Sequence, residues 1–312
     1  EVRAIASVTK DVLDHTITAL YFSGRTNAVS ELHRKTLLTK WKGYEGAQNI
    51  ISITNAQDYV YWHSENMYEA LKKDDDKSIK NIKRKWKKEL FERVADEDGE
   101  IYDENICTIV FAKRFTGYKR PGLLLHNMER FHALVTNAQR PVQVIWAGKP
   151  YPMDYTAIGV FDKIVNVCKI YPNCATLTGY ELSLSKMLKR GADVWLNHPR
   201  LTHEASGTSG MTAAMNAAVN VSLPDGWYPE YVKDKLNGFV IPPSSPDLPD
   251  YIQDEQDAEN LYTLLETEII PLYYDYPGRW LEIQKNGMRD ILPGFDSKRL
   301  AGEYYEKAYN YL

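Results

Sequence analysis

Short apolar runs alternate with stretches of helical periodicity from residue 106 onward. The runs are rich in β-branched side chains and are apolar on both faces, which is typical of parallel strands that helices cover on both sides. The pattern therefore predicts a doubly wound α/β domain with a parallel sheet. The predicted strands are 106–113, 142–149, 174–180, 192–197, 220–227 and 238–243, and the predicted helices between them are 121–138, 154–168 and 181–191.

The two ends of the chain show other patterns. Residues 11–41 have a helical pattern with polar interruptions, residues 42–58 look irregular, and residues 66–96 indicate helix and solvated linker. Residues 257–312 are rich in Leu, Tyr and Trp and predict further helices. Because proline removes a backbone donor, we expect these helices to break at Pro271, Pro277 and Pro293.

The most basic segment of the chain is 77–93, where lysines surround apolar residues at helical spacing. This arrangement predicts an amphipathic helix whose charged face is solvated. A surface for an anionic ligand is the alternative interpretation. The apolar positions are Ile79, Ile82, Trp86 and Leu90.

The overall composition argues against several classes of partner. The chain has 312 residues, of which 44% are hydrophobic and 26% are charged, with a formal net charge of −4 and a pI near 6.0. This balance gives no sign of a nucleic-acid or membrane partner. No apolar run approaches the roughly 18 residues of a membrane helix, and the first residues do not have the shape of a signal peptide. We therefore expect a cytoplasmic protein.

The cysteines and histidines do not form a metal-binding pattern. Cys107, Cys168 and Cys174 lie in or beside apolar runs, without the CxxC or Cys/His spacing of metal sites. They predict buried, reduced thiols. We expect no metal site.

Four cations follow the first predicted strand of the sheet. Lys113, Arg114, Lys119 and Arg120 lie within eight residues at its carboxyl end. Ligands of open α/β sheets bind beyond the carboxyl ends of the strands, and cations together with free backbone N–H groups favour an anion there. A phosphate is the expected occupant, and a set of surface cations with no ligand is the alternative.

A polar loop follows the predicted strand 192–197. Glu204 precedes a run of small and hydroxyl-bearing residues, and a helix-compatible segment comes next. Glycines let a backbone approach a ligand closely, while Ser and Thr can cap a helix and help to hold an anion or sugar hydroxyls. The alternative is an N-capped helix start beside an incidental acid. The run consists of Ser206, Gly207, Thr208, Ser209 and Gly210.

Together these segments resemble the α-glucan phosphorylases that act on glycogen, starch and maltodextrin, especially the bacterial and archaeal type. The similarity runs from about Thr16 to Gly238. It rests on matches that occur in the same order, namely 27-NAVSELH-33, 53-ITNA-56, 113-KRFTGYKR-120, 147-AGK-149, 180-YELSLSK-186 and 193-DVWLNHPRLTHEASGTSGM-211.

The resemblance implies a GT-B fold, in which two Rossmann-like domains face a deep cleft. It implies that inorganic phosphate cleaves α-1,4-glucans from the non-reducing end and releases glucose 1-phosphate with retention, with pyridoxal phosphate held as a Schiff base by a lysine. The chain would then contain the tail of the N-terminal domain (1–65), a helical linker (66–105) and a Rossmann-like C-terminal domain with terminal helices (106–312). A homodimer is one option for the oligomeric state.

By motif position, the resemblance assigns roles to several residues of these matching segments. Lys113 and Lys119 would bind the cofactor phosphate, Arg114 would bind the substrate phosphate, and these three form the expected catalytic set. Further contacts with the cofactor would come from Tyr180, Thr208 and Gly210 and from the residue at position 212. Contacts with glucose would come from Asn55, Tyr118, Glu204, Ser206 and Gly207.

The chain departs from the family's motif in two places. After Met211 the family has the lysine that bonds the cofactor, whereas this chain has Thr212, whose side chain carries no amine. Covalent attachment at Thr212 is therefore excluded, and pyridoxal phosphate is expected to be bound non-covalently or to be absent. After Asn55 the family usually has Gly-Val-His, and this chain has Ala56, Gln57 and Asp58.

Three functions are open at this point. The first is phosphorolysis by an α-glucan phosphorylase that binds its cofactor through phosphate contacts. The second is a retaining glycosyltransferase of the same architecture that works without pyridoxal phosphate, with Arg114 and Lys119 facing a nucleotide-sugar diphosphate. The third is a catalytically silent subunit that binds glucan and regulates. Intact Lys113, Arg114, Lys119 and Glu204 favour an enzyme, and Thr212 together with the altered segment after Asn55 favours the silent form.

Overall fold

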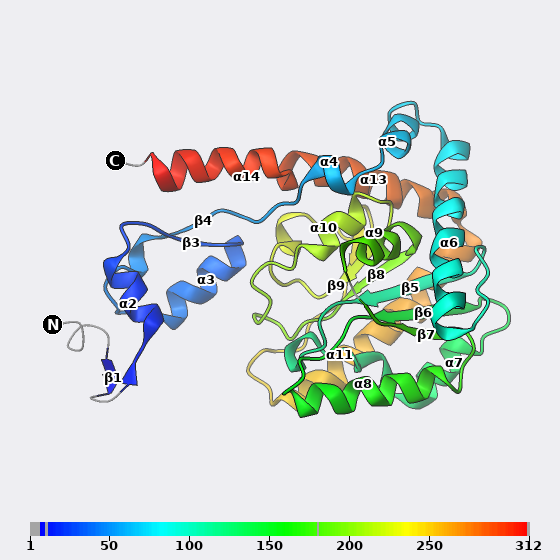
Figure 1. Ribbon diagram of the computed structural model, residues 1–312, viewed down its shortest axis with the longest axis horizontal. Helices are drawn as coiled ribbons and strands as arrows, with labels where there is room; N and C mark the ends of the chain where they lie inside the picture. The colour runs from blue at the N-terminus through cyan, green and yellow to red at the C-terminus, as the bar shows by residue number, and fades with distance from the viewer. Residues whose placement is uncertain (1–6, 10–11, 180, 311–312) are drawn as a thin grey trace.

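The apolar runs predicted as strands form one six-stranded sheet at the centre of a large lobe (Figure 1). All of its strand pairs are parallel, and their order across the sheet is β10-β9-β8-β5-β6-β7. The predicted α/β class, with a doubly wound, Rossmann-like sheet, is confirmed. The strands are β5 (Cys107–Ala112), β6 (Val142–Ala147), β7 (Cys174–Leu177), β8 (Val194–Asn197), β9 (Val219–Ser222) and β10 (Gly238–Val240).

The structure is a computed structural model and describes residues 7–9, 12–179 and 181–310. Besides the large lobe, residues near the N-terminus form a small lobe, and α14 (Ser297–Tyr304) extends from the large lobe back toward it (Figure 1).

Helices cover both faces of the sheet because successive residues of each strand point to opposite sides. Ile109 and Phe111 face a core that is completed by α7, α8 and α11, whereas Val110 and Ala112 face a core with α6, α9 and α10. The helices are α6 (Asp76–Asp98), α7 (Met128–Val135), α8 (Tyr155–Cys168), α9 (Leu182–Gly191), α10 (Ser209–Ala214) and α11 (Asp250–Leu264).

The helix predicted over 121–138 is divided in two. A short 3₁₀ helix, η3 (Leu123–Leu125), precedes α7, and the side chain of Asn127 accepts a hydrogen bond from Arg130 N. Asn127 therefore caps α7 and fixes a new helix start inside the predicted helix. The 3₁₀ turn η2 (Gly117–Lys119) lies in the preceding loop.

The C-terminal helices differ from the prediction at two of the three prolines. The break at Pro277 is confirmed, because α13 (Pro277–Phe295) begins there. The break at Pro271 is wrong, since helix continues from α11 through a π-helical turn, whose wider geometry accommodates the ring. The break at Pro293 is also wrong, because this residue lies in the last turn of α13. The π-helical turns are η5 (Leu265–Ile269) and η6 (Tyr305–Tyr309), and α12 is Ile270–Asp275.

The small lobe contains strands that the sequence did not reveal. Strand β3 (Thr26–Ala28) lies within 11–41, which was predicted to be helical. It pairs in parallel with β4 (Ile50–Ser52), which lies within 42–58, a segment that was predicted to be irregular. These strands have only three residues each, too few to produce a recognisable alternation. The other elements are β1 (Ser7–Thr9), β2 (Val12–Leu13), α2 (His15–Phe22), α3 (Glu31–Lys40) and η1 (Ala47–Asn49).

The two chain segments that join the lobes are hydrogen-bonded to each other. Gln57 N donates to Phe295 O at 3.0 Å, and Ser297 N donates to Gln57 O at 3.0 Å. The outgoing segment then forms α4 (Tyr59–Trp62) and α5 (Glu65–Lys72). The returning segment is the start of α14, and Tyr304 Oη accepts a hydrogen bond from Asn27 at 2.9 Å.

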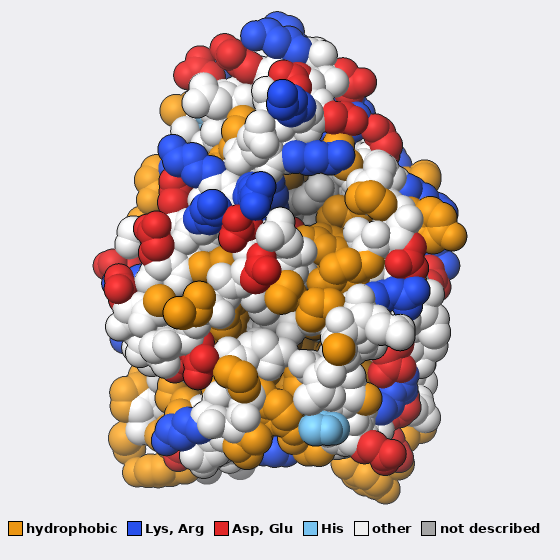
Figure 2. Space-filling view, turned by 90° about the vertical axis from the view of Figure 1, so that its right-hand side faces the viewer, with side chains coloured by type: hydrophobic (Ala, Val, Ile, Leu, Met, Phe, Trp, Pro, Cys, Tyr) orange, Lys and Arg blue, Asp and Glu red, His pale blue; other side chains and the backbone are white. Residues whose placement is uncertain are grey.

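The basic segment 77–93 forms most of α6, and its prediction is confirmed only in part. Ile79, Trp86 and Leu90 are buried as expected. However, Lys83 and Lys87 are buried as well, although lysines on an amphipathic helix usually reach solvent. Other Lys and Arg side chains gather on the upper part of the face that α6 presents (Figure 2).

The remaining expectations about composition concern the cysteines and the membrane. All three cysteines are free and buried, as predicted. Along the described part of the chain, no helix has both the length and the apolar character to cross a membrane.

A buried ion pair joins α6 to the amino end of β8. Lys87 Nζ lies 2.5 Å from Asp193 Oδ2 and also donates to Ile106 O at 2.7 Å. The same carboxylate oxygen accepts a hydrogen bond from Thr108 N at 3.0 Å, so it also holds the start of β5.

We expect Asp193→Asn to lower the free energy of unfolding by about 3–5 kcal/mol, because it leaves the Lys87 ammonium buried without its counter-ion. Urea denaturation of both proteins measures the difference. The matched control is Asp275→Asn, which removes the exposed Arg140–Asp275 pair (2.6 Å) and is expected to cost less than about 1 kcal/mol. Equal losses in the two variants would contradict this assignment.

Candidate functional site

The two polar segments singled out in the sequence meet at the carboxyl ends of β5 and β8. The strands are neighbours in the sheet, with Ile109 opposite Val194 and Val110 opposite Trp195. The loop after β5 and the loop after β8 therefore leave the sheet side by side, where ligands of open α/β sheets bind.

Lys113 leaves β5 and reaches across to β8 and α10. Its Nζ donates to Asn197 Oδ1 and to Ser209 Oγ, the latter at 3.1 Å. The same amine lies 5.9 Å from the centre of the Trp195 ring. Desolvation by burial, together with the nearby Lys119 charge, lowers the pKa of Lys113 to about 7. Lys113 therefore places a donor that readily gives up its proton at the start of α10.

Lys119 and Glu204 form an ion pair between the two loops. Lys119 Nζ lies 2.5 Å from Glu204 Oε2, and both side chains are largely buried. The resemblance assigned Lys119 to binding of a phosphate and Glu204 to binding of a sugar, as separate roles. In the structure each is the partner of the other, so any anion or sugar hydroxyl that enters must share or replace this contact.

The two arginines of the cationic segment differ in their surroundings. Arg114 is exposed, and among the described residues it has no ion pair or hydrogen bond. Arg120 is buried against Asp257 (2.8 Å) and the carbonyl of His198 (2.9 Å). The structure therefore makes Arg114 the available guanidinium and gives Arg120 a structural role.

Tyr118 lies beside the Lys119–Glu204 ion pair and is half-buried. The Lys119 amine is 5.0 Å from the centre of its ring. Its carbonyl accepts a hydrogen bond from Arg200 N at 2.6 Å, which ties the loop after β5 to the loop after β8.

The loop that carries Glu204 is held by a third segment, which follows β9. Glu204 N donates to Asp225 Oδ2 at 2.9 Å, and burial raises the pKa of Asp225 to about 6. Trp227 N donates to Ser206 O at 3.2 Å. Gly207 has a φ of 74°, the left-handed region that favours glycine. The loop is thus fixed by backbone contacts, and within the described residues the buried Ser206 hydroxyl has no partner.

The capping role expected for the hydroxyls is wrong for Thr208. Thr208 precedes α10 with φ −68° and ψ −12°, which are helical values, and its side chain forms no capping bond within the described structure. An N-cap residue normally has extended dihedral angles that point its oxygen toward the next turn. The Ser209 hydroxyl is instead turned toward Lys113.

Gly210 lies where a side chain would not fit. A Cβ atom at this position would be 2.6 Å from Asn220 Oδ1 and 2.9 Å from the Trp227 ring. Asn220 donates to Gly210 O at 2.9 Å and accepts from Asn197 Nδ2 at 3.2 Å. Gly210 therefore allows α10 to approach the amide pair that also holds Lys113.

Thr212, which stands where the family has its cofactor lysine, is an interior residue. Its side chain is 1% exposed and donates to Ser209 O at 3.0 Å. The Thr212 carbonyl accepts from Asn216 Nδ2 at 2.8 Å, and the same amide donates to Trp62 O at 3.0 Å. Trp62 is therefore a direct neighbour of the segment that contains Thr212.

A buried lysine that the sequence did not single out lies on the same tryptophan. Lys189 of α9 is 3% exposed, and its Nζ is 3.8 Å from the centre of the Trp62 ring and 2.8 Å from Ser185 Oγ. Burial lowers the pKa of Lys189 to about 7. In the sequence, Lys189 is one of two basic residues at the end of a helix, a common pattern that gives no sign of burial.

The second departure from the motif has a structural explanation. The Asp58 carboxylate accepts hydrogen bonds from Val60 N and Tyr61 N and so caps α4, the helix that presents Trp62. Asn55 lies in the segment between the lobes, where its backbone N donates to Val29 O at 3.0 Å. Within the described residues, its side chain forms no hydrogen bond with the loop after β5 or the loop after β8. Tyr180 lies outside the described residues.

Among the described residues, no group of three or more His, Cys, Asp or Glu side chains is placed to hold a metal ion.

Comparison with known proteins gives consistent matches. A sequence model of the family described as carbohydrate phosphorylase matches residues 16–234. The chain is 42% identical to the uncharacterized protein MJ1631 of Methanocaldococcus jannaschii, over 95% of this chain and 55% of that protein. It is 34% identical to the maltodextrin phosphorylase of Thermococcus litoralis, over 96% and 41% of the two chains. It is also 34% identical to the glycogen phosphorylase of Aquifex aeolicus, over 79% and 37%. The chain spans about half the length of these relatives, or less.

We expect Gly210→Ala to lower the free energy of unfolding by about 1–3 kcal/mol, because the new methyl group meets Asn220 and Trp227 in a packed interior. Gly159→Ala in α8 is the matched control, since a Cβ atom there has no neighbour within 4 Å. That control should gain up to about 1 kcal/mol from helix propensity. Urea denaturation compares the two, and a stabilised Gly210→Ala would contradict the contact.

We expect Lys189→Met to raise the free energy of unfolding at about pH 6, by roughly 2–4 kcal/mol, and to raise it less at about pH 9. Below about pH 7 the folded protein carries a buried ammonium, which costs free energy. Between pH 7 and 10.5 the unfolded chain binds the additional proton, so the stability of the unmodified protein rises with pH. Thermal and urea unfolding at both pH values measure the difference.

Lys85→Met is the control for this pH dependence, because the Lys85 side chain is 77% exposed. Its effect should be small and should not change between the two pH values. A Lys189→Met effect that is equally independent of pH would rule out the buried, low-pKa amine.

Proposed function

Because the chain belongs to the carbohydrate phosphorylase family, we propose that it takes part in phosphorolysis of α-1,4-glucan ends to glucose 1-phosphate. The observation that carries this proposal is the pairing of the loop after β5 with the loop after β8. It brings Lys119 against Glu204 and Lys113 against Ser209. Arg114 leaves the same loop after β5 with an exposed side chain. In the proposed architecture, the small lobe is the tail of a first Rossmann-like domain, and the two domains together form a GT-B cleft.

In the reaction, an oxygen of inorganic phosphate bonds to C1 of the terminal glucose while the glycosidic C–O bond breaks. The departing glucan oxygen takes the proton that the inorganic phosphate carried, so that atoms and charge balance. Positive charge develops on the sugar ring, and the site must hold two phosphate groups, that of the substrate and that of the cofactor. Fixed cations are therefore needed to stabilise the arrangement. Arg114 suits the substrate phosphate, since its guanidinium is exposed and has no partner in the described part of the chain.

Glu204 and its neighbours suit the sugar. The carboxylate can accept hydrogen bonds from ring hydroxyls, and the buried Ser206 hydroxyl lacks a partner within the described residues. Tyr118 adds a half-buried ring beside the same position. Backbone bonds to Asp225 and Trp227 hold this loop in place, which supports binding without rearrangement.

The residues present fit the phosphate group of pyridoxal phosphate but do not fit covalent attachment at position 212. Lys113 and Ser209 offer an amine and a hydroxyl 3.1 Å apart at the start of α10. Thr212 is buried, and its hydroxyl is committed to a backbone carbonyl. When bound, the cofactor would supply a second phosphate group to the reaction. Lys113 and Lys119 would then hold that group by charge-assisted hydrogen bonds.

A second candidate function is glucan binding without turnover. It is favoured by Thr212, whose side chain supplies no amine where the family has its cofactor lysine, and by the altered segment after Asn55. A retaining transferase that uses a nucleotide sugar, with Arg114 and Lys119 facing its diphosphate, is the third candidate. It requires no amine at position 212.

We expect the full-length protein to bind pyridoxal phosphate reversibly and to release glucose 1-phosphate from maltodextrin when phosphate is present. Absorbance before and after dialysis measures the cofactor, and a coupled assay measures the product. Arg114→Gln should reduce phosphate-dependent turnover by about a hundredfold or more, as for loss of a group that stabilises charge in the transition state. Glucan binding should survive this change.

Thr212→Lys tests the missing anchor, with Thr212→Val as the control that removes the hydroxyl without supplying an amine. We expect only the lysine variant to retain the cofactor through dialysis. Borohydride trapping followed by peptide mapping shows which amine is linked; a labelled peptide containing Lys189 in the unmodified protein would identify a different anchor. Glucan binding with neither cofactor nor turnover would support the silent function, and turnover with a nucleotide sugar alone would support the transferase.

A further inference from the structure

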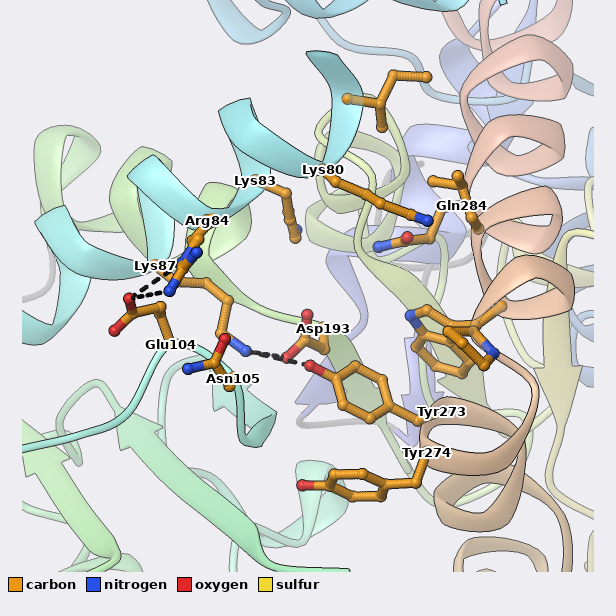
Figure 3. Close-up of a pocket in the computed structure, with 14 residues that line it drawn as sticks. Lys80, Lys83, Arg84, Lys87, Glu104, Asn105, Asp193, Tyr273, Tyr274 and Gln284 are labelled. Carbon is orange, nitrogen blue, oxygen red and sulfur yellow. Dashed lines mark hydrogen bonds and ion pairs between the residues drawn. The ribbon is translucent and has the colours of Figure 1, made fainter. Parts of the chain in front are cut away.

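A cavity lies at the opposite ends of the strands from the site described above. Its volume is about 400 Å³, and it is lined by α6, by the segments that precede β5 and β8, and by α12 and α13 (Figure 3). Asn105 and Asp193, which line it, come just before β5 and β8. The cavity therefore lies at the amino ends of the strands, away from the loops that carry Arg114 and Glu204.

Four cations on one face of α6 line this cavity. Figure 3 shows Lys87 extending toward Asp193 and Lys80 extending toward Gln284 on the facing helix. Two of the four are already neutralised, because Lys87 pairs with Asp193 at 2.5 Å and Arg84 pairs with Glu104 at 3.0 Å. The other two, Lys80 and Lys83, have no ion pair within the described residues.

Lys83 is the buried member of this pair. It is 6% exposed, and its amine donates to one acceptor, Asn216 O, at 3.2 Å. An ammonium has three N–H donors, so two of them have no acceptor in the described structure. Desolvation by burial lowers the pKa of Lys83 to about 7, against the opposing effect of Asp193. A buried amine with this few acceptors would gain from an anion inside the cavity.

The opposite wall supplies an unpaired donor and flat apolar surface. Trp280 lines the cavity and is 4% exposed, and its indole N–H has no hydrogen-bond partner among the described residues. Such buried orphan donors are uncommon in folded proteins and mark a place where a partner is missing. Tyr273, Tyr274 and Leu281 extend the same wall.

We propose that this cavity binds a small organic phosphate monoester. Its phosphate would accept hydrogen bonds from Lys83, Lys80 and the Trp280 N–H, and its organic part would pack against the aromatic wall. Two unpaired cations and an additional N–H donor match a dianion with three acceptor oxygens better than they match a carboxylate. The volume lies within the range of small-ligand sites in proteins.

The occupant would also act on α10, which joins this cavity to the proposed catalytic site. The two cavity residues Lys83 and Gln284 hold the turn that ends α10, by donating to Asn216 O and to Ala217 O (2.7 Å). Asn216 in turn holds the Thr212 carbonyl. A phosphate that draws the Lys83 amine away from Asn216 O would loosen one end of α10, whose other end contacts Lys113 through Ser209. This regulatory part rests on the proposed function, whereas binding in the cavity does not.

Calorimetric titration of the full-length protein with phenyl phosphate tests the binding. The titration uses an Arg114→Gln background, which weakens the substrate-phosphate position of the proposed catalytic site, and the Lys83→Met comparison separates the cavity from any binding at Lys113 and Lys119. We expect Lys83→Met to weaken binding about tenfold or more, as for loss of a charge-assisted hydrogen bond, and Trp280→Phe to weaken it several-fold while keeping the ring. Lys85→Met, on the exposed side of α6, should change affinity less than about twofold.

The choice of ligand identifies which part is recognised. Weaker binding of glycerol 2-phosphate than of phenyl phosphate would support the contact between the organic part and the aromatic wall. Equal binding would overturn that contact and support only the position of the phosphate. Absence of binding by phenyl phosphate would overturn the site. An affinity of Lys83→Met and Trp280→Phe equal to that of the Arg114→Gln protein would also overturn it. Neither result depends on whether the protein catalyses phosphorolysis.

Hydrogen exchange of residues 209–214 tests the coupling to α10. Phenyl phosphate should accelerate exchange of these amides in the Arg114→Gln protein and leave them unchanged when Lys83→Met is added. Unchanged exchange on binding would overturn the coupling and leave the binding site intact.

Discussion

The parallel register of β5 and β8 is the constraint on which the polar contacts of the candidate site depend. Because Ile109 lies opposite Val194, the last residues of both strands end at the same level of the sheet. Lys113 can therefore reach Asn197, and the loops that follow can join Lys119 to Glu204. A shift of one residue would turn each of these side chains to the other face. The apolar residues that fix the register, buried on both sides, thus position groups that are distant in the sequence.

Three lysines, Lys83, Lys113 and Lys189, carry amines inside the large lobe, and burial lowers the pKa of each to about 7. A buried amine costs stability, so a chain selected for stability alone would be expected to have apolar residues at these positions. All three lie around one short helix: Lys113 contacts its start, Lys83 holds the turn at its end, and Lys189 shares Trp62 with it. The helix α10 is therefore surrounded by groups whose charge responds to their surroundings near neutral pH.

The sequence was sufficient to predict the large lobe and the location of the candidate site. Local composition is enough to identify apolar runs such as 106–113 as strands. In a parallel sheet, the loop after each strand must then lie at the carboxyl end of that strand. The family's motif also identified Thr212 as a departure at the position of the cofactor lysine. The pairing of Lys119 with Glu204 could not be predicted, because it depends on how two loops meet across the fold. Nor could the burial of Lys83 and Lys189 be recognised, since lysine in an amphipathic helix normally indicates solvent. Pro271 was misread because the π-helical turn that tolerates it has no clear sequence pattern.

The hydrogen-bonded crossing of Gln57 with Phe295 and Ser297 is one of the places where the lobes are held together. Both connections between the lobes pass through this point and are bonded to each other there. The small lobe also contacts the loop after β8 directly, because Ser30 Oγ donates to Ala205 O at 2.6 Å. Separation of the lobes would therefore break a hydrogen bond to the loop that forms the candidate site, so the position of the small lobe and the position of that loop are linked.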